Sequence, residues 1–227
     1  MCASSGLGRD MRAFQSHQGL LVPYVAANVD TDQIIPARFL HRARKQGYGN
    51  LLFHDLRYDD AGRERPDFVL NQEPYRRATI LLAGPNFGCG SSREHAVWAL
   101  VDHGFKAVIA PSFGDIFYNN CSKNGLLAIV AEEALLKALA NETQRRAGAM
   151  ATIDLAEQSI MSEDGRRWSF TIDLYRKQAL LEGASEIEMT LKAIGEIESF
   201  EAAYGSKVPW AVQPTLACRP AAGRRES

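Results

Sequence analysis

The side chains with the clearest chemical potential lie in one short segment, GCGSSREH, at positions 88–95. Gly88 and Gly90 can adopt positive φ angles and let the backbone approach a ligand closely. The guanidinium of Arg93 offers a fork of donors that suits a carboxylate or a phosphate. Together these features predict an anion-binding turn.

The serines of this segment have the spacing of a helix start. Ser91 and Glu94 stand in the S-x-x-E relation of a capping box, which predicts a helix from Ser92 to Gly104 with the serines at its N-terminus. The first turn of a helix offers unpaired backbone N–H groups and the positive end of the helix dipole, so it favours an anion. For the serines alone, plain helix capping with Arg93 as a surface charge is the alternative.

The common phosphate and nucleophile motifs do not fit this segment. The dinucleotide fingerprint has a third glycine where Arg93 stands. The P-loop needs Gly-Lys followed by Ser or Thr, and the nucleophile elbow needs a glycine that closes the pattern after its serine; both features are missing. The residues alone therefore leave the identity of the anion open.

The elements around this segment predict how it is held. Short apolar runs predict strands at 78–83, 105–110 and 126–130, and the stretches between them predict helices at 92–104 and 113–123. This alternation indicates crossover units and a partly parallel sheet.

The rest of the chain completes a mixed α/β fold. Before the central part we expect a strand at 19–27, a basic loop or short helix at 38–50 and a long polar excursion at 55–77. After it we expect a helix at 132–147, a β-hairpin around the turn at 163–166, and helices at 174–182 and 186–204. No linker divides the chain, so the prediction is one α/β domain with a mixed, partly parallel sheet and a β-hairpin addition.

Length and composition exclude several classes of protein. The 227 residues, 46% of them hydrophobic, suffice for one sizeable core. A net charge of -1 argues against a general nucleic-acid binder. No apolar run has the length of a membrane span, and the N-terminus lacks the apolar core of a secretory signal. We therefore expect a cytoplasmic protein with no nucleic-acid or membrane partner.

The four cysteines predict reduced thiols rather than a metal site in this chain. Cys2, Cys89, Cys121 and Cys218 form no C-x-x-C pair and are too few for a disulfide scaffold. Although Cys89 lies in the serine loop, a small thiol packed beneath the loop is favoured over a nucleophile or cluster ligand.

Three motifs carry a resemblance to a known family. They are NVDTDQIIPARF at 28–39, GPNFGCGSSREHA at 84–96 and AVIAPSFGDIFYNN at 107–120. In this order they resemble the small subunits of 3-isopropylmalate dehydratase, in the aconitase superfamily. The resemblance implies a single swivelling β/β/α domain over about 13–210. It leaves an extension at 1–12, in which Met11 is a possible true start, and a tail at 211–227, both expected to be disordered.

The resemblance also implies an activity and a partner. The expected reaction is that of a hydro-lyase of leucine biosynthesis, which isomerises 2-isopropylmalate to 3-isopropylmalate by dehydration and rehydration. The small subunit is expected to be active only with a large subunit, which supplies three cysteine ligands to a [4Fe–4S] cluster. The substrate is a small dicarboxylate.

By resemblance, individual residues receive roles. Ser91 is the expected base, and Ser92 and Arg93 are expected to bind a substrate carboxylate. From the basic segment 38–45, one side chain is expected to reach a substrate carboxylate, with a solvated surface as the equal alternative; the candidates are Arg42, Arg44 and Lys45. The supporting residues are Gly88, Gly90, Glu94, Asp30, Thr31 and Asp32.

Neighbouring polar residues receive structural roles. Asn28, Asp30 and Asp32 alternate like a calcium loop, but the glycine and glutamate that such a loop needs are missing. His95 and His103 are expected to be structural.

Two other functions stay open on this evidence. One is the small subunit of a related split hydro-lyase that acts on a homoaconitate-type acid or another substituted malate. The other is a non-catalytic module that uses the helix-terminal site to sense an anion.

Overall fold

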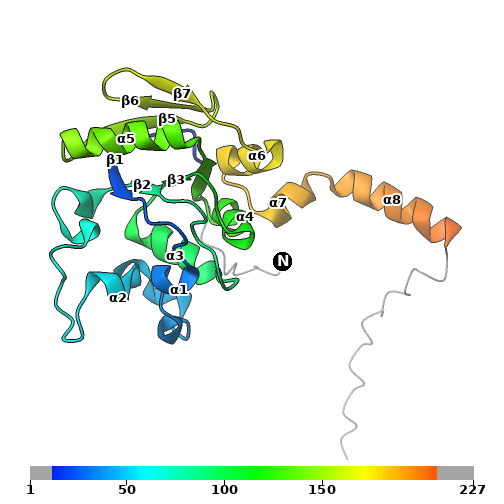
Figure 1. The fold of residues 1–227 in the computed structure, drawn as a ribbon. Helices are drawn as coiled ribbons and strands as arrows, with labels where there is room; N and C mark the ends of the chain where they lie inside the picture. The colour runs from blue at the N-terminus through cyan, green and yellow to red at the C-terminus, as the bar shows by residue number, and fades with distance from the viewer. Residues whose placement is uncertain (1–11, 209–227) are drawn as a thin grey trace, which may run out of the picture. The chain divides into compact units, whose positions relative to one another are not determined.

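A curled seven-stranded sheet forms the centre of the molecule (Figure 1). The structure is a computed structural model that describes residues 12–208. The strands are β1 Ser16–Tyr24, β2 Ile80–Ala83, β3 Ala107–Ala110, β4 Leu127–Val130, β5 Met150–Asp154, β6 Ser159–Ser162 and β7 Arg167–Ser169. Their order is β4-β3-β2-β1-β5-β6-β7. The first four are parallel and the last three antiparallel, which confirms the predicted mixed sheet.

Alternate residues of the parallel strands enter two separate cores, because successive side chains of a strand point to opposite faces. One face carries a register row of Val22, Leu81, Val108 and Ala128. The other face carries Leu21, Ile80, Ala107 and Leu127. Both faces are covered, as the short apolar runs of these strands require.

Helices cover these two faces (Figure 1). Helices α3 (Glu94–His103) and α4 (Asp115–Lys123) pack in the first core, and α5 (Glu133–Arg145) packs in the second. The crossover order β2-α3-β3-α4-β4 is the predicted one. The β6–β7 pair forms the predicted hairpin, and β5 extends it on the other side.

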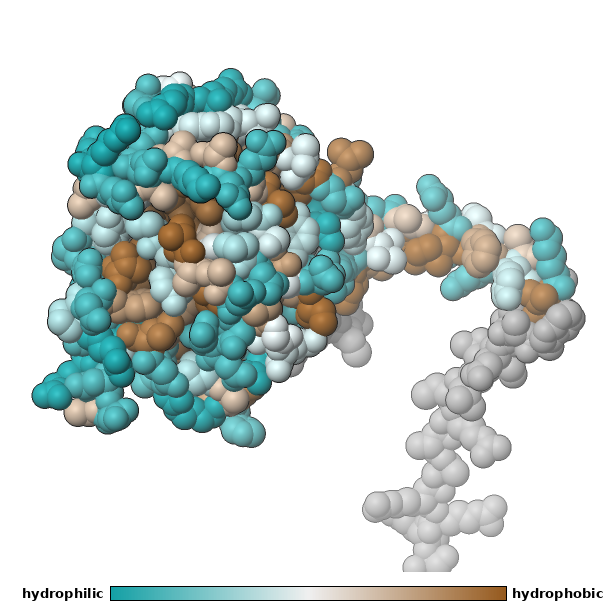
Figure 2. All heavy atoms as spheres, in the orientation of Figure 1, coloured by the Kyte–Doolittle hydropathy of each residue, from teal (hydrophilic) through white to brown (hydrophobic). Residues whose placement is uncertain are grey.

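The described part of the chain divides into two compact units, with the boundary between residues 186 and 187. Helix α6 (Leu174–Glu182) belongs to the first unit, and α7 (Glu186–Leu191) begins at its end. Helix α8 (Ile194–Lys207) follows, so the single helix expected over 186–204 is wrong: two helices stand there. Apolar side chains lie on the surface of these helices (Figure 2). Within residues 12–208, no helix is both long enough and apolar enough to span a bilayer. The expected extension and tail lie almost wholly outside the described residues.

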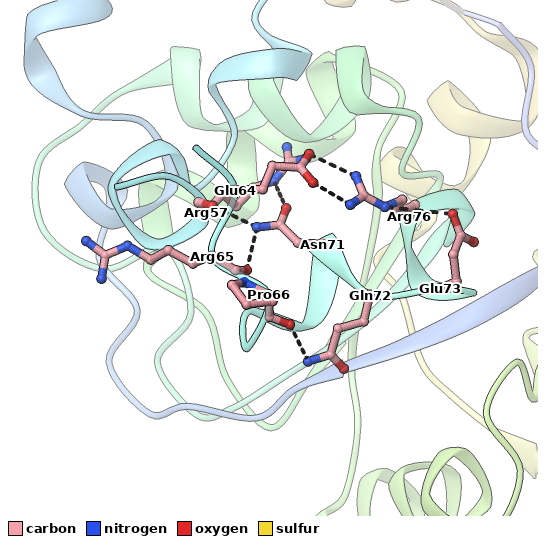
Figure 3. Close-up of polar contacts among 8 residues, drawn as sticks. All are labelled: Arg57, Glu64, Arg65, Pro66, Asn71, Gln72, Glu73 and Arg76. Atoms are coloured by element: carbon pink, nitrogen blue, oxygen red, sulfur yellow. Dashed lines mark hydrogen bonds and ion pairs between the residues drawn. The ribbon is translucent and has the colours of Figure 1, made fainter. Parts of the chain in front are cut away.

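The polar excursion at 55–77 is an ordered structure within this chain (Figure 3). It contains α2 (His54–Arg57) and the 3₁₀ turns Val69–Asn71 and Tyr75–Arg77. The buried Asn71 accepts a hydrogen bond from Arg57 Nε at 3.1 Å and donates to the carbonyl oxygens of Arg57 and Arg65 at 2.7 and 2.9 Å. At the surface, Arg76 pairs with Glu64 through two nitrogens. One buried amide therefore holds the two ends of the excursion together.

Candidate functional site

Three loops meet at the carboxyl ends of β1, β2 and β3. Because these strands are parallel and adjacent, the segments that follow them emerge at one edge of the sheet. Crevices at this edge are the usual ligand sites of open α/β sheets. The loops begin at residues 25, 84 and 111 and contain parts of the three motifs that carry the resemblance.

Backbone hydrogen bonds join the three loops. The Gly88 N–H donates to the Val29 carbonyl oxygen at 2.7 Å, and the Thr31 N–H donates to the Cys89 carbonyl oxygen at 2.9 Å. On the other side, the Gly114 N–H donates to the Phe87 carbonyl oxygen at 2.9 Å. The serine loop is therefore held between the other two loops like a short added strand.

Two glycines of the serine loop are required by its conformation. Gly88 has a φ of +73°, and a Cβ atom there would lie 2.2 Å from Cγ of Phe117. Gly90 has a φ of +88°. Residues with a side chain rarely adopt positive φ angles, so the backbone path requires glycine at both positions, as the sequence indicated.

The predicted capping box is wrong. Helix α3 begins at Glu94, two residues later than expected, and its N-cap is Arg93, whose side chain makes no capping hydrogen bond. Glu94 instead accepts a hydrogen bond at 2.8 Å from Nδ2 of Asn124, at the end of α4. Ser91 and Ser92 are exposed and precede the helix. Their hydroxyls are thus not used for capping.

Long-range contacts hold the serine turn in place. Thr31 Oγ1 donates to the Ser91 carbonyl oxygen at 2.9 Å, and Arg93 forms an ion pair with Asp32. Asp30 caps the short helix α1 (Thr31–Ile34), because its Oδ1 accepts from the Gln33 N–H at 2.7 Å. Thr31 and Asp32 of the first motif therefore orient the turn and the guanidinium of Arg93, and Asp30 fixes the helix that carries them.

The basic segment is tied to the far end of α3. Asp102, whose side chain is 5% exposed, forms an ion pair with Arg44 and accepts a hydrogen bond from the Tyr48 N–H at 2.8 Å. The Tyr48 hydroxyl donates to the Arg42 carbonyl oxygen at 2.5 Å. The guanidinium of Arg44 also lies over the ring of Trp98, 5.0 Å from its centroid. We call this set (Arg44, Tyr48, Trp98 and Asp102) the latch.

Only one of the three predicted cations, Arg44, belongs to the latch. Arg44 is paired within the fold, while Lys45 is exposed and Arg42 donates through Nε to Gln46 Oε1 at 3.3 Å on the surface. Nearby, Arg38 forms an ion pair with Asp55 and lowers the pKa of that carboxyl to about 2. Arg42 and Lys45 are therefore the members of the predicted set that face solvent.

The two histidines of α3 pack against the segment before it. His95 lies 4.5 Å from the Trp98 ring and 5.5 Å from the Tyr48 ring, between centroids. His103 places Nδ1 3.3 Å from the Gly49 carbonyl oxygen. Burial lowers the pKa of both rings and so favours their neutral forms.

The two cysteines within the described residues, Cys89 and Cys121, are free thiols. Cys121 is fully buried in α4, and burial raises its pKa well above the usual value. Cys89, within the serine loop, is half-buried. Among residues 12–208, no three His, Cys, Asp or Glu side chains gather where they could hold a metal ion.

Sequence reasoning missed Asp102 and Tyr48. A signal for Asp102 was present, because an acidic residue in the last turn of a helix opposes the helix dipole and needs a compensating partner. The partner's position, 58 residues away, was not visible in the sequence.

Comparisons with known proteins agree with the motifs. Residues 11–134 match the family model described as "Aconitase C-terminal domain", and residues 137–173 match one described as "LeuD_N". Relatives named "3-isopropylmalate dehydratase small subunit" include one from Roseobacter denitrificans, 48% identical over 200 residues, and one from Rhodospirillum centenum, 49% identical over 202 residues. These matches cover 88% and 89% of this chain and 100% of each relative.

A solved structure has the same fold. The crystal structure of 3-isopropylmalate dehydratase (leuD) from Methanocaldococcus jannaschii superposes with a TM-score of 0.56 and is 28% identical in sequence. The superposition covers 82% of this chain and 99% of that one.

Proposed function

Because the chain belongs to the family of 3-isopropylmalate dehydratase small subunits, we propose that it works in a hydro-lyase that interconverts 2-isopropylmalate and 3-isopropylmalate. The observation that carries this proposal is the junction of three loops at one sheet edge, where two exposed serine hydroxyls stand beside Arg93. Such a turn suits a dicarboxylate. The reaction belongs to leucine biosynthesis, and we propose a cytoplasmic location.

The serine turn supplies the proton transfer and one carboxylate contact. Ser91 Oγ takes the proton from the substrate carbon during dehydration and returns it during rehydration. Ser92 and Arg93 hold a substrate carboxylate. Asp32 is close to one terminal nitrogen of Arg93, so the remaining donors of the guanidinium stay available for the substrate.

A serine hydroxyl is a weak base on its own, so its surroundings must stabilise the alkoxide. Arg93 is close in sequence, and the start of α3 directs its positive dipole end to the same region. The exposed turn also leaves one side of the site open to a second polypeptide. A cation from that partner would complete the stabilisation.

The large subunit is the partner that we propose for this open side. It would hold a [4Fe–4S] cluster, which, when bound, supplies Lewis-acid chemistry toward the substrate hydroxyl. The described residues of this chain fit a role beside such a cluster rather than as its ligands, because Cys121 is enclosed in the core and no three metal-ligating side chains gather within residues 12–208. This chain contributes the base and the carboxylate contacts.

The basic segment supplies the second carboxylate contact. We assign that contact to Arg42 or Lys45, which face solvent, and assign Arg44 to holding the segment through Asp102. The main-chain carbonyl of Arg42 is fixed by Tyr48, so the latch sets where these cations stand.

The test is anaerobic co-expression of this chain with the large subunit. The pair should interconvert 2- and 3-isopropylmalate, and neither chain alone should do so. In the pair, Ser91→Ala should lower kcat by about 10²–10⁴-fold, whereas Ser169→Ala, at an exposed strand position, should leave it unchanged.

Two results would contradict the proposal. If Ser91→Ala keeps the kcat of the wild type, Ser91 is not the base. If the pair prefers a homoaconitate-type acid, the substrate assignment is wrong while the reaction class stands.

A further inference from the structure

Helix α8 carries an uncovered apolar stripe. Its apolar side chains recur every three or four residues, which places them on one side of the helix, and they are Ile194, Ile197, Phe200 and Tyr204. Phe200 is 65% exposed, although phenylalanine is among the residues that proteins most often bury. In α7, Ile187 and Leu191 have the same helical spacing and are 72% and 55% exposed.

The stripe forms a continuous surface rather than scattered residues. The rings of Phe200 and Tyr204 stack, with centroids 5.5 Å apart and planes 18° apart. Figure 2 shows apolar atoms along these helices. Contiguous apolar surface of this kind on a soluble protein marks an interaction site.

Glutamates lie on both sides of the stripe. With 100° of rotation per residue, Glu196 and Glu198 project to opposite sides of the line through Ile197 and Phe200. Residues 187–207 contain four glutamates and two lysines, so this segment carries a net negative charge. A complementary partner has an apolar groove with basic rims. A second copy of the same helix would bring acidic rims to acidic rims.

The helices are part of what this chain shares with its relatives. The matches to the two named small subunits cover 200 and 202 residues and include the whole of each relative. The first compact unit ends at residue 186, so such a match must extend into the second unit. A segment retained in full-length small subunits is suited to a partner that such subunits have.

On the basis of the function proposed above, we propose that α7 and α8 dock the large subunit, with the stripe of α8 in an apolar groove rimmed by basic side chains. The serine turn and this docking helix then have separate tasks. The turn contributes chemistry, and the helix contributes affinity for the partner.

The experiment measures binding of the full chain to purified large subunit. The double variant Ile197→Asp/Phe200→Asp should weaken the complex about 100-fold, because large aromatic and apolar anchors carry most of the affinity of an interface. The matched control is Ala202→Asp, which adds the same charge at an exposed position away from the stripe. It should change the dissociation constant by less than about threefold.

A second pair of variants tests the basic rims. Glu196→Lys/Glu198→Lys should weaken binding about tenfold or more, with the loss largest at low salt. Thermal unfolding of the first unit, followed by circular dichroism, should be unchanged in all of these variants.

The possible results distinguish failure of the docking surface from failure of the proposed function. Unchanged binding by the stripe variant, or tighter binding by the glutamate variant, overturns the docking surface while leaving the proposed reaction intact. If the stripe variant only abolishes self-association of the chain alone, the stripe binds a second copy and the inference is wrong. If the wild-type chain does not bind the large subunit at all, the proposed function fails as well.

Discussion

Replacing Gly88 by alanine tests how the serine turn is built. Gly88 lies in the left-handed region, with a φ of +73°, directly before the turn that carries Ser91 and Ser92. The added methyl would meet Phe117 at 2.2 Å, and that ring belongs to the first core. The ring packs edge-on against Phe87 and so has little room to move.

The expected destabilisation has two parts. The left-handed backbone costs an alanine about 1–2 kcal/mol, and overpacking a filled core costs about 1–3 kcal/mol more. The sum is about 2–5 kcal/mol, a large fraction of the free energy of unfolding of a typical domain.

A matched glycine separates these two parts. Gly62 has a φ of +75°, and a Cβ atom there meets nothing within 4 Å. Gly62→Ala should therefore cost only the backbone part, about 1–2 kcal/mol. The measurement is urea unfolding of both variants and wild type, followed by circular dichroism.

The difference in free energy of unfolding between the two variants shows whether the turn packs closely on Phe117. An excess of about 1–3 kcal/mol for Gly88→Ala supports the close packing of the turn on Phe117. Equal destabilisation of the two variants would refute it. The same variant, assembled with the large subunit, should also lose kcat, because the clash displaces the serines, whereas Gly62→Ala should keep it.

Three further predictions follow from the site. Asp102→Asn should raise the KM for isopropylmalate about tenfold with kcat changed less than threefold, because the basic segment loses its anchor but the serine turn does not; an equal fall in kcat would contradict this separation. Arg93→Lys should lower kcat/KM about 10²-fold despite the retained charge, because a lysine lacks the fork that serves Asp32 and the substrate together; wild-type kinetics would show that a point charge suffices. Alkylation of the native chain at pH 7, mapped by peptide mass, should modify Cys89 well before Cys121, whose thiol is buried and has a raised pKa; early labelling of Cys121 would contradict its burial.

The sheet could be predicted from the sequence because its signals are local. The runs around Leu81, Val108 and Ala128 are short, apolar and bounded by turn residues, and the helices between them have the length of crossovers. The glycines of the serine loop were also predictable, because a close backbone approach leaves glycine as the only suitable residue. These parts of the fold depend on neighbours in sequence.

The start of α3 could not be predicted, because it is decided by distant residues. The S-x-x-E spacing favoured a capping box, but Arg93 is extended and paired with Asp32, and Glu94 is bonded to Asn124. These two tertiary contacts thus outweigh one local motif. The ordered excursion around Asn71 is a similar case, since its composition indicated only a polar loop.

Helix α3 connects the two parts of the site. It begins beside the serine turn and ends at the latch, where Asp102 fixes the basic segment. Ten residues of helix span about 15 Å and behave as a rigid element. The distance between the turn and the basic segment is therefore set by a packed helix and not by a mobile loop. On the assignment proposed above, a change of substrate would come from exchanging Arg42 or Lys45, because moving the segment would break the buried contacts of Asp102.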